Sequence, residues 1–156
     1  MKKIFLSSLF LLLFLSLTAC GNTKENIETN TAAKEKTSKI LIAYFSRTGN
    51  TKEIALKIQE KTNGELFEIQ PAEPYPENYK ETTDKAKQEL SSGYLPPLKT
   101  KINNLESYDI IFIGYPIWWG TIPGPVRTFL TENDFSGKII IPFCTHGGSG
   151  IASSTS

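Results

Sequence analysis

Residues 39–51 read KILIAYFSRTGNT, and this segment is the most informative one about the fold. Its first half, 39–45, is apolar after the opening lysine and has the length of a strand that is covered on both faces. Its second half, 46–51, combines three hydroxyl side chains, an amide and a glycine just where a helical pattern starts. A strand of this kind needs helices on both sides of its sheet, so the stretch predicts an α/β protein.

Helix and strand patterns continue to alternate after this stretch. Residues Ile54, Ala55 and Ile58 recur at helical spacing, and Asn63 and Gly64 end that helix. The expected helices are 51–62, 77–91 (a surface helix with a weak apolar stripe) and about 125–130; the expected further strands are 65–70, 108–114 and 138–144. This order predicts a doubly wound parallel sheet in three layers, α/β/α, whose ligand lies at the carboxyl ends of the strands.

The first loop at such an end is typical of phosphate binding. It consists of Ser46, Arg47, Thr48, Gly49, Asn50 and Thr51. Unpaired amides and a positive dipole at a helix N-terminus attract an anion, and glycine lets the backbone wrap closely around it. The patterns GxxxxGK[ST] and GxGxxG are both absent, which disfavours a P-loop nucleotide site. The alternative interpretation is an ordinary Ser/Thr helix cap.

The second loop contains both tryptophans of the chain, Trp118 and Trp119, between glycines and prolines of the segment 114–125. Aromatic side chains held by such a rigid loop suggest a platform for a flat ring. The alternative is that the indoles fold into the core, which adjacent side chains cannot easily both do.

The third loop, 144–150, has three glycines in four positions, so its backbone groups are free to bond the edge of a planar heterocycle. Cys144 and His146 could also form a nucleophilic pair, although no orienting acid accompanies them. The Cys-x5-Arg pattern of small phosphatases is absent, because the sixth residue after the cysteine is Gly150.

Segments 44–51, 114–120 and 145–150 together resemble flavodoxin, and the resemblance runs from about Lys39 to the last residue. It implies a strand order 2-1-3-4-5, non-covalent FMN, one-electron transfer between redox partner proteins, and no catalytic residue. It assigns the flavin phosphate to the first loop, ring stacking to Trp118 or Trp119, and the ring's pyrimidine edge to the amides of 147–150. The cofactor-binding residues implied are Ser46, Arg47, Thr48, Gly49, Asn50, Thr51, Pro116, Ile117, Trp118, Trp119, Gly120, Thr145, His146, Gly147, Gly148, Ser149 and Gly150.

In one respect this sequence differs from the flavodoxin pattern. Flavodoxins continue after the third loop with a helix, a fifth strand and a final helix, whereas this sequence ends at Ser156. We therefore expect a C-terminally truncated domain over 39–156 without strand five and the last helices. The apolar strand at 138–144 would then be an exposed edge.

The N-terminus is typical of an export signal. Lys2 and Lys3 precede an apolar segment, 4–17, that is too short to span a bilayer but suits a signal peptide. Residues 17–21 (LTACG) resemble the lipobox of bacterial lipoproteins, which implies a signal peptide 1–19 and a lipid on Cys20. The polar segment 20–38 is then a flexible tether, and the domain lies at the extracytoplasmic face of a bacterial membrane. A plain signal peptide or an uncleaved anchor is the alternative.

Charge and composition exclude several classes of function. The net charge of +1 in 156 residues offers no excess for nucleic acid, and two cysteines with one histidine disfavour a disulfide framework or a metal site. Without the first nineteen residues, 15 basic side chains face 16 acidic ones, so charge steering of a redox partner is weak. Two other functions stay open: an FMN-dependent NAD(P)H reductase of quinones or nitro compounds, and a flavin-free solute-binding or interaction module.

Overall fold

The computed structural model describes residues 38–155. The expected signal peptide, Cys20 and nearly all of the tether therefore lie outside the described residues. Within the part that is described, no helix combines the length and the apolar character needed to cross a bilayer.

Four parallel strands form one sheet in the order β2-β1-β3-β4. They are β1 (Ile40–Tyr44), β2 (Glu65–Glu68), β3 (Ile110–Pro116) and β4 (Ile139–Thr145). Leu41 lies opposite Glu65 on one side and Ile111 on the other, and Ile111 in turn lies opposite Ile140. The sheet confirms the predicted fold class and the order 2-1-3-4.

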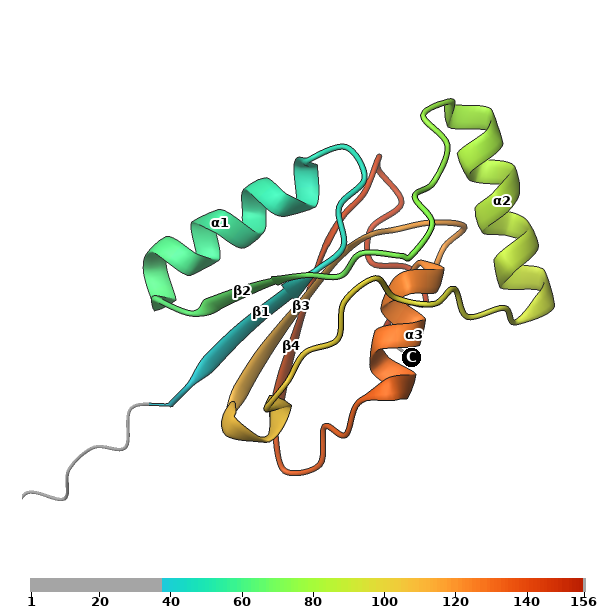
Figure 1. Ribbon diagram of the computed structural model, residues 1–156. Helices are drawn as coiled ribbons and strands as arrows, with labels where there is room; N and C mark the ends of the chain where they lie inside the picture. Colours follow the sequence, from blue (N-terminus) through green and yellow to red (C-terminus); the bar gives the residue numbers. More distant parts are fainter. Residues whose placement is uncertain (1–37, 156) are drawn as a thin grey trace, which may run out of the picture. The chain divides into compact units, whose positions relative to one another are not determined.

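Helices cover both faces of this sheet (Figure 1). Helix α1 (Asn50–Thr62) packs on one face, whereas α2 (Tyr79–Ser92) and α3 (Gly124–Glu132) lie on the other. Each connection from a strand through a helix returns to a parallel strand, so the loops that follow β1, β3 and β4 all come to the same end of the sheet.

The two faces of β1 feed two separate cores, because successive side chains on a strand point to opposite sides. Ile42 and Tyr44 pack against Ala55 of α1. Leu41, on the other face, belongs to a larger cluster that includes Phe129 of α3. Each fully buried side chain of this size contributes about 1.5–3 kcal/mol, so these clusters fix the loops above them.

Element boundaries differ from the expected ones by at most two residues, for local reasons. Helix α2 begins at Tyr79 because the Asn78 side chain accepts a hydrogen bond from the Glu81 amide and caps it. Strand β3 begins at Ile110, two residues later than expected, because an unpredicted 3-10 helix (Leu105–Ser107) with Tyr108 as its C-cap precedes it.

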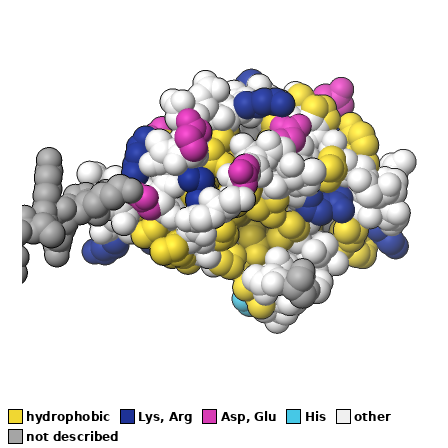
Figure 2. Space-filling model, turned by 90° about the horizontal axis from the view of Figure 1, so that it is seen from below, with side chains coloured by type: hydrophobic (Ala, Val, Ile, Leu, Met, Phe, Trp, Pro, Cys, Tyr) yellow, Lys and Arg dark blue, Asp and Glu magenta, His cyan; other side chains and the backbone are white. Residues whose placement is uncertain are grey.

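Strand β4 is an edge of the sheet within the described residues. Its side chains Ile139, Ile140 and Ile141 keep 59, 38 and 36% of their surface exposed. Figure 2 shows hydrophobic side chains gathered on one exposed face of the molecule. Partly buried positions on this strand begin only toward its carboxyl end, where Phe143 and Cys144 pack against the two cores.

Candidate functional site

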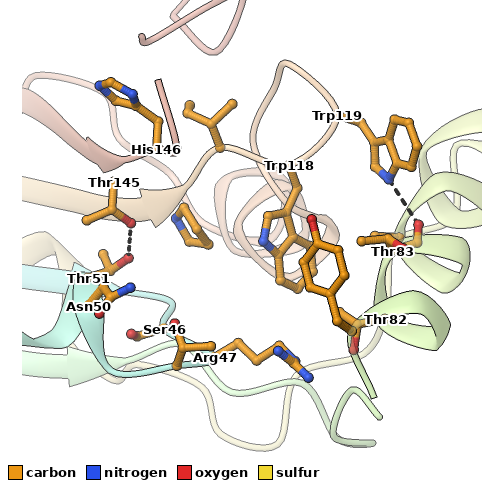
Figure 3. A pocket seen from close by; sticks show the side chains of 16 residues that line it. Ser46, Arg47, Asn50, Thr51, Thr82, Thr83, Trp118, Trp119, Thr145 and His146 are labelled. Atoms are coloured by element: carbon orange, nitrogen blue, oxygen red, sulfur yellow. Dashed lines mark hydrogen bonds between the residues drawn. The ribbon is translucent and has the colours of Figure 1, made fainter. Parts of the chain in front are cut away.

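A cavity of about 390 Å³ opens at the carboxyl ends of the strands, where the three unusual loops meet (Figure 3). Segments of these loops line it together with one side of α2. The lining residues are Ser46, Arg47, Thr48, Asn50, Thr51, Tyr79, Thr82, Thr83, Ala86, Pro116, Ile117, Trp118, Trp119, Thr145, His146 and Gly147. Five residues expected at the site lie in the same loops but outside this lining: Gly49, Gly120, Gly148, Ser149 and Gly150.

Helix α1 begins at the cavity without a side-chain cap. Its N-cap is Gly49, with φ of +90° and ψ of −20°, a left-handed conformation that glycine adopts without strain. The amide of Glu53 makes the first backbone bond of the helix, to the Gly49 carbonyl at 2.9 Å. The amides before it have no acceptor inside the helix, and the dipole makes this end positive. The interpretation as an ordinary Ser/Thr cap is therefore wrong, and the end is suited to an anion.

A pair of hydroxyl groups joins the first loop to the third. Thr51, which is 1% exposed, has its Oγ1 atom 2.9 Å from Oγ1 of Thr145 at the end of β4. The hydrogen bond holds the first turn of α1 against the neighbouring strand end, as the dashed line in Figure 3 shows. The two loops thus have a fixed relative position.

Arg47 does not point at the start of α1. Its guanidinium donates to the carbonyl of Pro76 at 2.8 Å and to the carbonyl of Glu77, so it holds the segment that leads into α2. Figure 3 shows the side chain extending toward the helix that carries Thr82. Arg47 lines the cavity, as expected, but its charged group is occupied by backbone contacts.

The second loop makes a tight turn that sends its two indoles in different directions. The amide of Trp118 bonds the carbonyl of Thr121 at 3.0 Å, and the reverse bond is 3.1 Å. Trp119 and Gly120, the central residues, both have positive φ (+52° and +76°), as in a type I′ turn. Adjacent residues in such a turn cannot share one buried direction, which agrees with the expectation that the two indoles do not both fold inward.

Trp118 is the inner indole and is fixed by other aromatic rings. Its ring centroid lies 5.3 Å from that of Phe45 and 4.9 Å from that of Tyr75, in both cases nearly perpendicular. Edge-to-face contacts of this kind stabilise by about 0.5–1.5 kcal/mol each beyond burial. The indole is therefore a rigid wall of the cavity.

Trp119 is the outer indole and is 51% exposed. Its Nε1 donates to the carbonyl of Thr83 at 2.9 Å, which ties the turn to α2. The ammonium of Lys87 lies 5.0 Å from the ring centroid. Trp119 thus closes the cavity on the side of α2.

A buried polar pair supports Trp118 from behind. The hydroxyl of Tyr75 donates to Oε2 of Glu89, which is 5% exposed. Burial, followed by this hydrogen bond, raises the pKa of Tyr75 well above its ordinary value. The second carboxylate oxygen, Oε1, is buried without a hydrogen-bond partner among residues 38–155. The pair holds the Tyr75 ring, and through it the indole, in one orientation.

The third loop is held by hydrogen bonds to one of its own side chains and not by pairing with a neighbouring strand. Nδ1 of His146 accepts hydrogen bonds from the amides of Gly148 and Gly150, each at 3.1 Å. Two of the amides expected to face a ligand are therefore used internally. In the described part of the chain, the amides of Gly147 and Ser149 keep no such partner.

The covalent alternative loses its support at this site. Cys144 is half-buried beside the larger core cluster and does not line the cavity, and Nδ1 of His146 accepts hydrogen bonds from two glycine amides. Residues 38–155 also contain no group of three or more His, Cys, Asp or Glu side chains that could hold a metal ion.

Helix α2 contributes a wall that the sequence analysis did not include. Tyr79, Thr82, Thr83 and Ala86 line the cavity, and Thr82 and Ala86 are buried. The hydroxyl of Thr82 is already bonded to the Pro76 carbonyl at 2.6 Å. A weak stripe of threonine and alanine carries no signal of a ligand, so only the packing of the helix reveals this wall.

Residues 39–156 match the family model for Flavodoxin. A protein from Bacteroides eggerthii DSM 20697 and one from Bacteroides uniformis ATCC 8492, each provisionally named a flavoprotein, have similar crystal structures. The first is 40% identical, with a TM-score of 0.68 over 73% of this chain and 74% of its own. The second is 41% identical, with a TM-score of 0.68 over 73% of this chain and 76% of its own.

A flavoprotein from Lactobacillus acidophilus NCFM, whose crystal structure is a complex with FMN, is also similar. It is 30% identical, with a TM-score of 0.65 over 71% of this chain and 76% of its own. Among curated proteins, none matches the chain.

Proposed function

This chain belongs to the flavodoxin family, and on that premise we propose that it binds FMN without a covalent bond and carries electrons between redox proteins. We propose further that a lipid on Cys20 tethers it to the outer face of a bacterial membrane. One observation carries the cofactor proposal: the uncapped start of α1 faces, across one cavity, the turn that holds both tryptophans.

The residues at the start of α1 fit a phosphate group. A dianion needs several N–H or O–H donors and a positive field, and this end of the helix offers free first-turn amides and the dipole. The hydroxyls of Ser46 and Thr48 and the amide of Asn50 lie in the same lining. Gly49 gives the loop its left-handed bend at no steric cost. These groups would hold the phosphate.

The opposite walls fit a flat, mostly apolar ring. Trp118 presents a fixed indole, Pro116 and Ile117 add apolar surface, and Trp119 closes the side toward α2. The free amides of Gly147 and Ser149 offer donors for the ring's polar edge. These residues would orient the ring and exclude water from it.

FMN supplies the redox chemistry when it is bound, and the surrounding residues set its reduction potentials by stabilising or destabilising negative charge on the ring. Of the described lining residues, Arg47 alone has a permanent charge, and its guanidinium is occupied by two carbonyls. Apolar walls without a free cation disfavour added negative charge on a bound ring. The site therefore favours a low potential for full reduction.

The tether rests on the sequence of the first 38 residues. A short apolar segment behind two lysines is followed by LTACG, in which Cys20 occupies the position of the lipid-bearing cysteine of bacterial lipoproteins. More than one acyl chain is needed for a stable membrane anchor. Expression of Cys20→Ala in a bacterial host tests this: the native chain should partition into the detergent phase, and the variant should not. Equal partition of the two proteins contradicts the tether.

Titration of the full chain in detergent micelles with FMN tests the cofactor. Both tryptophans of the protein belong to the cavity turn, so their emission reports on the site alone. The proposal predicts saturable quenching of both tryptophan and flavin fluorescence at a stoichiometry of one. Unchanged emission in a sample with native circular dichroism contradicts it.

Two matched measurements separate the alternatives. Steady-state oxidation of NADH by the FMN-loaded chain alone would favour a reductase, and its absence favours the carrier. The variant Trp118→Ala distinguishes the flavin site from an interaction module, because only the flavin site predicts a loss of FMN affinity. The variant Tyr94→Ala, which removes an exposed ring outside the lining, serves as the control.

A further inference from the structure

The third loop depends on one imidazole. Nδ1 of His146 is the acceptor for two amides of the same loop, those of Gly148 and Gly150. These glycines have φ of +116° and +69°, so the loop makes two left-handed bends that no strand ladder supports. The remaining side-chain contact within the loop is a long hydrogen bond of 3.4 Å from Ser149 Oγ to the Gly150 carbonyl. The imidazole thus makes the two short hydrogen bonds that hold the loop in its bent conformation.

Such a contact requires one protonation state of the ring. A nitrogen that accepts hydrogen bonds carries no proton, so the imidazole is neutral with its hydrogen on Nε2. A second proton on the ring would bind to Nδ1, which could then no longer accept hydrogen bonds from the two amide N–H groups. Both hydrogen bonds would then be lost together.

The same residue lies at the cavity. His146 and Gly147 both line it, on the side of the third loop next to Thr145 in Figure 3. The amides of Gly147 and Ser149 alternate with the two amides that the imidazole holds. The direction of the free amides therefore follows from the bonds to Nδ1.

We propose that neutral His146 is the positioning residue that shapes loop 147–150 for the flavin ring, and that the chain releases flavin when His146 takes up a proton. This inference rests on the proposed function, because it concerns the same site. It adds a regulation by proton concentration that the binding of FMN alone does not require.

Charged side chains on the neighbouring elements do not contact the imidazole. The titratable or charged groups on the elements next to the loop are Lys52, Glu53, Lys57, Glu60 and Lys61 on α1, Tyr115 on β3, Cys144 on β4, and Arg47 and Tyr79 in the cavity lining. Glu53 is paired with Lys57 at 2.6 Å, and Arg47 is bonded to two carbonyls. Within residues 38–155, none of these groups makes an ion pair or hydrogen bond with the imidazole.

Linkage gives the expected magnitude. If only the neutral form binds, the apparent Kd rises about tenfold for each pH unit below the midpoint of the imidazole titration. By reciprocity, saturating FMN shifts that midpoint to lower pH.

The chain contains a single histidine, so ¹⁵N NMR of the full chain in micelles reports on this ring without assignment. The inference predicts the Nε2–H tautomer at pH 8, and a midpoint that moves to lower pH when FMN is added. An Nδ1–H tautomer, or a midpoint that FMN leaves unchanged, overturns the inference.

Binding titrations between pH 5 and 8.5 supply the second test, with two variants. His146→Asn keeps an acceptor at the Nδ1 position that cannot be protonated, and His146→Leu removes it. We expect about tenfold weaker FMN binding in His146→Leu than in the native chain at pH 8, because two hydrogen bonds are lost; the difference should shrink at low pH, where the native chain loses the same two bonds. His146→Asn should recover most of that loss and bind with less dependence on pH than the native chain.

Riboflavin controls for the ligand's own proton, because a phosphate monoester loses its second proton at about pH 6. The difference between the native chain and His146→Asn should persist with riboflavin. Tight binding with identical pH profiles in the two proteins overturns the inference alone. Absence of FMN binding by the native chain at pH 8.5 overturns the proposed function, and the inference with it.

Discussion

The substitution Gly49→Ala isolates the backbone conformation at the start of α1. Gly49 has φ of +90°, and a Cβ placed there meets no heavy atom within 4 Å. Alanine therefore causes no clash, and its whole effect comes from the left-handed conformation. That conformation costs a residue with a side chain about 1–2 kcal/mol.

The same free energy sets the expected change in binding. The variant can relieve the strain by rotating φ to a negative value, which turns the neighbouring amides away from the helix N-terminus. FMN must then reverse this rotation, so its affinity falls by about 5- to 30-fold. Riboflavin has the same ring but no phosphate, and we expect its affinity to stay unchanged.

The assay is a fluorescence titration of each protein with FMN and with riboflavin, beside a urea unfolding curve. Gly137→Ala is the matched control, because Gly137 also has a positive φ (+73°) and open space for a Cβ. It lies before the amino end of β4, away from the cavity. It should lose similar stability and keep its FMN affinity.

Two results would refute the reasoning about this loop. One is an equal loss of affinity for FMN and riboflavin in Gly49→Ala, which would mean that the substitution acts on the ring site. The other is a loss of stability with unchanged FMN affinity, which would mean that the phosphate does not contact this end of the helix.

The packing around the cavity yields three further expectations. In Gly114→Ala the new Cβ would lie 2.1 Å from the Phe143 ring, so the free energy of unfolding in urea should fall by about 1–3 kcal/mol. Adding Phe143→Leu should recover part of this loss, and no recovery would contradict the assigned clash. Tyr75→Phe leaves both carboxylate oxygens of Glu89 without a hydrogen-bond partner among the described residues, so the free energy of unfolding should fall by about 1–3 kcal/mol in the same assay. A change near zero would contradict the hydrogen bond between Tyr75 and Glu89. Burial and a carboxylate partner raise the pKa of Tyr108 from 10 to about 12, so its contribution is complete below pH 10 and is lost as the pH rises toward 12. Tyr108→Phe should flatten stability over that interval, and parallel curves for the two proteins would count against it.

The sheet and the first loop were predictable because their signals are local. An apolar run of strand length followed by hydroxyls and Gly49 determines a strand, a turn and a helix N-terminus within thirteen residues. The structure adds the reason for the glycine, which is the left-handed N-cap of α1. It also shows that the hydroxyl of Thr51 bonds Thr145.

The features of the site that local patterns could not predict depend on contacts across the fold. Arg47 was expected among the cofactor-binding residues, but its partners are carbonyls some thirty positions later in the chain, whose proximity no local pattern encodes. The α2 wall has the same origin, since Thr83 contacts Trp119 only when helix α2 has packed against the tryptophan turn. The role of Nδ1 of His146 follows from the bends at the glycines, which the sequence permits but does not specify.

The central claim is that the first turn of α1 receives a phosphate while the tryptophan turn receives the ring. Two-dimensional ¹H–¹⁵N NMR of the full chain in micelles, with FMN and then with riboflavin, measures this residue by residue. Both ligands should shift the indole signals of Trp118 and Trp119, and only FMN should strongly shift the amides of 49–52. Absence of any shift at 49–52 with FMN, in a sample whose indole signals do respond, would contradict the account.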